Sequence, residues 1–111
     1  MITILAFLLT LGVLIVVHEY GHYRVAVACD VKVLRFSIGF GKVLFTRRLG
    51  ADQTEFVLSA LPLGGYVRML DEREEAVPPQ ELHRAFNRKP LWQRAAVVAA
   101  GPAANLGLAV L

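Results

Sequence analysis

Hydrophobic residues dominate both ends of the chain, and a charged segment separates them. Between residues 2 and 17 the only polar side chains are those of Thr3 and Thr10, and apolar character resumes at Val25 after a short polar cluster. A helix over 2–29 would be roughly 40 Å long, which exceeds the roughly 30 Å hydrocarbon core of a bilayer. The pattern predicts one complete transmembrane helix over 2–29, tilted or with one end among the lipid headgroups.

A second apolar segment, residues 93–111, contains no charged residue after Arg94. Gly101 and Pro102 lie inside it, and such a pair ends or kinks most helices. A membrane helix tolerates the pair when neighbouring helices or waters satisfy the freed carbonyl groups. We therefore expect 93–111 to be the start of a second transmembrane helix, in the N-terminal part of a longer protein.

The polar middle of the chain, residues 30–92, contains short runs rich in β-branched and aromatic residues, separated by glycine-rich or charged turns. These runs are 31–38, 43–45, 54–58 and 62–67. They predict a small antiparallel hairpin or sheet, followed over 71–90 by a charged loop with one short helix. The expected fold class is a mainly α membrane protein with one complete transmembrane helix, this β-hairpin region and the start of a second transmembrane helix.

The distribution of charge predicts how the chain is oriented. Hydrophobic residues make up 56% of the 111 residues, and all 12 Lys and Arg lie between Arg24 and Arg94. Eight of the nine acidic residues share that stretch, which carries 12 minus 8, or +4, and Glu19 is the exception. A Lys/Arg-rich loop beside a membrane span stays in the cytoplasm. We expect the N-terminus on the periplasmic side and residues 30–92 on the cytoplasmic side.

Two other interpretations of these patterns, a nucleic-acid-binding protein and a cleavable signal peptide, are disfavoured. The basic residues are interspersed with apolar and acidic ones instead of forming a dense basic run, which argues against a nucleic-acid partner. A cleavable signal peptide would have a basic n-region and a small-residue cleavage pattern, and neither precedes His18.

His18, Glu19 and His22 are the residues with candidate metal chemistry, in the sequence His-Glu-Tyr-Gly-His. Residues four apart on a helix differ by only about 40° in direction and about 6 Å in height, so both imidazoles can reach one metal ion. Zinc suits two histidine ligands, and a catalytic zinc site adds one more protein ligand and a water. Glu19, next to the first ligand, can accept a proton from that water.

The position of the motif strengthens this interpretation. By chance the pattern would arise in a chain of this length about a few times per thousand, mostly in polar segments. Here it lies near the end of an uncharged apolar run. Ionisable groups at membrane depth are costly unless they are paired or ligate something, which favours a metal site over two structural histidines.

Several segments together resemble the site-2 protease family. The motif at 18–22 is followed in family order by Phe-Ser-Ile-Gly-Phe-Gly at 36–41, Pro-Leu-Gly-Gly-Tyr-Val-Arg-Met at 62–69, Ala-Phe-Asn at 85–87 and Ala-Gly-Pro-Ala-Ala-Asn at 100–105. The resemblance covers nearly the whole chain. It implies a bacterial intramembrane zinc metalloendopeptidase of the inner membrane, with several membrane spans, that cleaves single-pass membrane proteins such as an anti-sigma factor in a stress response.

The resemblance also assigns roles to residues. It implies that His18 and His22 ligate Zn²⁺, that Glu19 is the general base, and that the third ligand is an Asp in a later membrane segment beyond residue 111. PDZ domains and the remaining transmembrane segments would also lie beyond that point. Local substitutes for the third ligand would be Asp52, Asp71 or His83, all in charged, loop-like stretches.

The predicted sheet and one amide are candidates for substrate binding. A helical substrate must unwind before its peptide bonds can be cut, and an exposed strand edge can hold the unwound segment. Gly64 and Gly65 would allow close backbone approach there, although the sheet can equally pack only on the helices. Asn105 matches a family residue near the active site, where its amide would orient the substrate backbone; an interhelical hydrogen bond is the alternative.

Two other functions remain open on the sequence alone. A membrane metal-binding or transport protein could use the same histidines without hydrolysis and would not need Glu19 as a base. A soluble zinc protease with a signal anchor would place its next metal ligand in a soluble stretch and not in another apolar segment.

Overall fold

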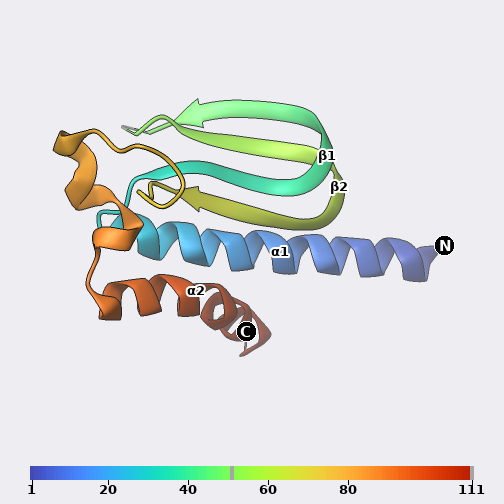
Figure 1. The fold of residues 1–111 in the computed structure, drawn as a ribbon. Coiled ribbons are helices and arrows are strands. Elements are labelled where there is room, and N and C mark those ends of the chain that lie inside the picture. The colour runs from blue at the N-terminus through green and yellow to red at the C-terminus, as the bar shows by residue number, and fades with distance from the viewer. Residues whose placement is uncertain (51, 111) are drawn as a thin grey trace.

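The computed structural model describes residues 1–50 and 52–110, and at Pro62 and Leu63 it describes only the backbone. Two long helices and two long strands make up the fold, and two short 3₁₀ helices connect the second strand to the second long helix. In chain order they are α1 (Ile2–Ala28), β1 (Val33–Leu49), β2 (Thr54–Met69), η1 (Pro79–Arg84), η2 (Phe86–Arg88) and α2 (Leu91–Val110). Helix α1 lies between the sheet on one side and α2 on the other (Figure 1).

The two strands form an antiparallel sheet in which each strand bends back near its middle (Figure 1). As a result, Phe36 in the first half of β1 pairs with Val67 on one side and with Phe56 on the other. The bend of β1 uses Gly39 and Gly41, whose φ angles of 85° and 82° are costly for residues with a Cβ atom. The last part of β2 forms the sheet edge that runs along α1 (Figure 1).

The buried core lies where the end of α1, the start of β1 and α2 meet. Ala26, Val31, Val33 and Val97 are at most 1% exposed and form one cluster. An aromatic group extends it under the sheet, since the Tyr23 ring lies 5.6 Å from the ring of Phe36 and 5.6 Å from that of Phe56. The C-terminal half of α1 is therefore held on both sides.

The N-terminal half of α1 is exposed instead. Phe7 is 64% and Leu9 71% exposed, and within residues 1–50 and 52–110 only α1 is long and apolar enough to cross a membrane. Leaving this many apolar side chains in water would be costly, which suggests a bilayer around them. Helix α2 does not reach the same apolarity.

These elements confirm the predicted helices and the antiparallel sheet, with two differences. The separate short strands predicted over 31–67 are joined into β1 and β2, because the glycines bend the backbone without ending the pairing. The single short helix predicted in the loop is two 3₁₀ turns. Helix α2 continues through Pro102, and Gly101 before it has no Cβ to clash with the proline ring.

Candidate metal centre

The two histidines of α1 point their outer nitrogens at one another. His18 and His22 lie one turn apart, and their Nε2 atoms are 3.1 Å apart with the rings nearly perpendicular. Two ligands of a tetrahedral zinc ion with bonds of about 2.05 Å lie about 3.3 Å apart. The separation of these nitrogens therefore fits a shared zinc ion.

Glu19 completes the cluster from the buried side of α1. Its residue is 9% exposed, and its Oε1 atom lies 4.0 Å from Nε2 of His18. The ligand atoms of His18, Glu19 and His22 lie within 4.8 Å of one another, the only such group in the described residues. Among the described residues, no lysine or arginine forms an ion pair with Glu19. The position of this carboxylate beside the two histidines fits a group that acts at a shared metal ion.

Helix α2 supports the histidines from the opposite side. Nδ1 of His22 lies 2.6 Å from the carbonyl oxygen of Val97. A carbonyl oxygen can only accept, so Nδ1 carries the proton and Nε2 presents a lone pair towards the metal position. A Cβ atom on Gly101 would lie 2.7 Å from Nε2 of His18 and nearer still to Nε2 of His22. Only glycine leaves the metal position open at residue 101.

The close approach of the two helices depends on a second glycine. A Cβ atom on Gly21 would lie 2.5 Å from the carbonyl oxygen of Ala100 and 2.8 Å from Cβ of Ala104. Gly21 therefore permits tight packing of α1 against α2. The neighbouring Tyr20 is 52% exposed, so it points away from the metal position.

The sheet edge lies against the same cluster. A Cβ atom on Gly65 would lie 2.6 Å from the carbonyl oxygen of Ser37 and 3.3 Å from Cγ of Glu19. One on Gly64 would meet the ring of Phe40. Both glycines therefore occupy positions where a side chain has no room, and Gly65 brings the backbone of β2 beside the candidate base.

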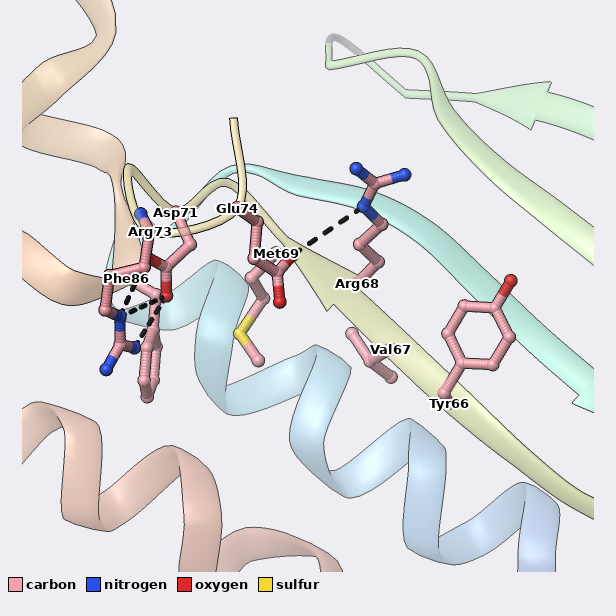
Figure 2. Close-up of a pocket in the computed structure, with 8 residues that line it drawn as sticks. All are labelled: Tyr66, Val67, Arg68, Met69, Asp71, Arg73, Glu74 and Phe86. Atoms are coloured by element: carbon pink, nitrogen blue, oxygen red, sulfur yellow. Dashed lines mark hydrogen bonds and ion pairs between the residues drawn. The ribbon is translucent and has the colours of Figure 1, made fainter. Parts of the chain in front are cut away.

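Three hollows follow one another along this edge. The first, of about 330 Å³, lies beside His18, Glu19, Gly64 and Asn105, and a second of about 260 Å³ shares Glu19 with it. The third, of about 440 Å³, shares residues 66, 67 and 69 with the second and opens among charged side chains (Figure 2). Together they form a groove beside β2 that passes the metal cluster and ends at the charged loop.

The local substitutes for a third ligand lie away from this cluster. The Arg84 guanidinium contacts both oxygens of Asp52 at 2.6 and 2.7 Å and lowers the pKa of that carboxyl. Arg73 contacts both oxygens of Asp71 and lowers its pKa in the same way (Figure 2). His83 lies in η1, outside the metal-binding group. Each of these two carboxylates already has a cationic partner.

The structure places close together four residues that the sequence singled out, namely His18, Glu19, His22 and Asn105. Nδ2 of Asn105 lies 3.3 Å from Nδ1 of His18, so the Asn105 side chain reaches across from α2 to α1. Val97 and Gly101 were missed. Their four-residue spacing to Asn105 puts all three on one face of α2, and this spacing is the signal that could have identified them.

Comparison with known proteins decides the family. The model of peptidase family M50 matches residues 6–111 of this chain. The chain belongs to peptidase family M50. This membership confirms the resemblance to site-2 proteases drawn from the motifs.

Individual M50 relatives are similar over nearly the whole chain. The regulator of sigma-E protease RseP of Escherichia coli is 57% identical over 105 residues, which cover 95% of this chain and 23% of the relative. Protease RseP of Yersinia pestis is 57% identical over 106 residues, covering 96% and 23%. A relative from Ralstonia nicotianae, whose name describes a zinc metalloprotease, is 56% identical over 117 residues, covering 99% and 25%. The chain thus spans about a quarter of the length of these relatives.

Proposed function

We propose that this chain carries the zinc-binding and proton-accepting part of an intramembrane zinc metalloendopeptidase. The observation that carries the proposal is the cluster of His18, Glu19 and His22 on the apolar helix α1, with both Nε2 atoms at the spacing of zinc ligands. Family M50 membership and relatives named as zinc metalloproteases support it. The third metal ligand is an Asp from a segment beyond residue 111.

The chemistry divides between the metal ion and the side chains. Bound zinc supplies a Lewis acid that polarises the scissile carbonyl and lowers the pKa of water. His18 and His22 hold the metal position, and Gly101 keeps it open. Glu19 accepts the proton of the attacking water at its carboxylate and returns it to the leaving amine. The protein around Glu19 limits access of bulk water, since the residue is 9% exposed.

The sheet edge beside Glu19 holds the substrate in our proposal. An unwound segment lies in the groove along β2, with its backbone next to Gly64 and Gly65, and adds to the edge as an extra strand. Asn105 lines the same hollow and contributes amide contacts to the substrate backbone. The polar residues that flank the membrane segment of the substrate then reach the charged end of the groove (Figure 2).

The bend of the sheet lies at membrane depth in the same proposal. Gly64 lines a hollow together with Leu11 and Leu14 of α1, which belong to the apolar run. The bend also exposes large apolar side chains, among them Phe40 at 47% and Val43 at 52%. Lipid contact removes this area from water, so we place the bend in the bilayer and the charged loop at its cytoplasmic surface.

The setting of the whole enzyme follows from the family and the charge pattern. We propose a bacterial inner-membrane protein with several spans, α2 among them, its N-terminus on the periplasmic side and residues 30–92 on the cytoplasmic side except for the bend of the sheet, which dips into the bilayer. Its substrates are single-pass membrane proteins of the anti-sigma factor type, and their cleavage releases a stress-response regulator. A relative named as a regulator of sigma-E supports this substrate class.

The decisive experiment is Glu19→Gln in the full-length protein. We expect complete loss of cleavage of a single-pass membrane substrate, with membrane insertion and zinc content unchanged, because the amide keeps the shape but cannot accept the proton. Glu81→Gln, which removes the partner of Lys32 at the start of β1, is the matched control and should retain cleavage. Retained cleavage by Glu19→Gln would refute the role of the base. If the Glu19→Gln variant still carries zinc across the membrane, a transport function is favoured instead.

A further inference from the structure

Asn105 has one polar atom whose role the proposed function does not explain. Its Oδ1 atom is buried and has no hydrogen-bond partner among the described residues. Its Nδ2 atom lies 3.3 Å from Nδ1 of His18, a long contact for a hydrogen bond between nitrogens. A buried polar atom without a partner costs about 1–3 kcal/mol, so the orientation of this amide has consequences for the site.

The orientation of the amide fixes the proton on His18. If Nδ2 of Asn105 donates, Nδ1 of His18 must accept, and the ring proton then lies on Nε2. That proton points at Nε2 of His22, 3.1 Å away, and occupies the metal position. If the amide is turned by half a revolution, which leaves its shape unchanged, Oδ1 accepts the proton of Nδ1. Nε2 of His18 is then a free lone pair, as a zinc ligand must be.

We propose that Asn105 is a positioning residue for the metal, and that its side-chain oxygen holds His18 in the zinc-binding tautomer. The Val97 carbonyl oxygen does the same for His22 through the 2.6 Å hydrogen bond. The two acceptors lie four residues on either side of Gly101, on one face of α2. Helix α2 thus orients both ligands and leaves room for the ion between them, although it contributes no ligand itself.

This arrangement separates the two polar ends of the Asn105 side chain. In the proposed orientation, Oδ1 of Asn105 accepts the Nδ1 proton of His18, and the amide N–H₂ group makes no hydrogen bond to His18. After the turn, that group takes the buried place of Oδ1, where no described residue accepts a hydrogen bond from it. Metal binding therefore depends on the side-chain oxygen of Asn105, and an aspartate that keeps this oxygen tests the role directly.

The test rests on the proposed zinc site and uses the full-length protein with Asn105→Ala, Asn105→Leu and Asn105→Asp. Zinc affinity is measured by competition with a chromogenic chelator, and the visible absorption of bound Co²⁺ reports ligand geometry. We expect Ala and Leu to weaken zinc binding about 10–100-fold, the range for lost partners of metal-bound histidine. Asp keeps an acceptor oxygen and should stay within a few-fold of the parent protein.

Two outcomes would overturn this role for Asn105. One is unchanged zinc affinity and Co²⁺ spectrum in a folded Ala or Leu variant; the other is an Asp variant that binds zinc as weakly as Leu. Circular dichroism verifies folding, and the comparison of Asp with Leu decides the matter if Ala does not fold. His18→Ala separates this inference from the proposed function. If His18→Ala leaves zinc affinity unchanged, the metal site itself is wrong; if it alone loses zinc, only the role of Asn105 fails.

Discussion

Replacing Gly101 by alanine gives the sharpest test of how α2 shapes the metal position. The added Cβ atom would lie 2.7 Å from Nε2 of His18, and nearer to Nε2 of His22. Ordinary contacts of this kind lie at about 3.5 Å, so the His18 nitrogen must retreat by about 0.8 Å. Zinc–nitrogen bonds vary by only about 0.2 Å, so the shift breaks the ligand geometry.

We expect Gly101→Ala in the full-length protein to weaken zinc binding at least ~100-fold, or by ~2.7 kcal/mol, and to abolish cleavage. The matched control is Gly107→Ala on the same helix, where an added Cβ meets no atom within 4 Å. The control should keep both properties and stabilise the helix by up to ~1 kcal/mol. Zinc content, chelator competition and helicity by circular dichroism are measured for both. Parent-like zinc affinity and cleavage in Gly101→Ala would refute the steric reasoning.

Three further expectations concern packing, charge and the incomplete ligand set. Gly21→Ala should lower the thermal unfolding midpoint in detergent by several degrees through its clash with the Ala100 carbonyl, and an equal effect from the unhindered Gly12→Ala would contradict this. The pKa of Asp52 is lowered by Arg84, so the stabilisation of up to ~1 kcal/mol is present above the ordinary pKa of about 3.9 and is lost as pH falls below it. Arg84→Gln should remove the part of the acid dependence that Asp52 contributes and leave the part from the Asp71–Arg73 pair; an unchanged acid dependence would exclude the Asp52–Arg84 pair as a cause. Residues 1–111 alone should bind zinc weakly and hydrolyse nothing, and tight one-to-one binding by calorimetry would show that a third ligand is unnecessary.

Local patterns in the sequence were enough to predict the helices and the metal cluster. Helix α1 follows from an uninterrupted apolar run, and the approach of His18 to His22 follows from a four-residue spacing. Both depend only on near neighbours along the chain. The return of each strand on itself does not, because Gly39 and Gly41 are compatible with either a turn or a bend in a continuous strand. The missing information is the pairing of distant segments.

The supporting face of α2 was hidden from the sequence for the same reason. Gly101 beside Pro102 indicates only an irregular helix until His18 and His22 are placed opposite it. Asn105 was identified through the family motif, and its two possible partners could not be separated without the position of His18. The ligands are encoded locally, whereas the groups that orient them depend on how α1 and α2 pack.

Backbone hydrogen bonds hold the sheet at one end, and the other end is exposed. At the base of the sheet, the N–H of Lys32 donates to the carbonyl oxygen of Arg84, and the carbonyl oxygen of Lys32 accepts from the N–H of Leu70. The bend at the far end is exposed. An element that is held at one end moves least at that end and most at its exposed end. We therefore expect a segment that enters beside Gly65 to displace the exposed bend more than the base, which keeps its register.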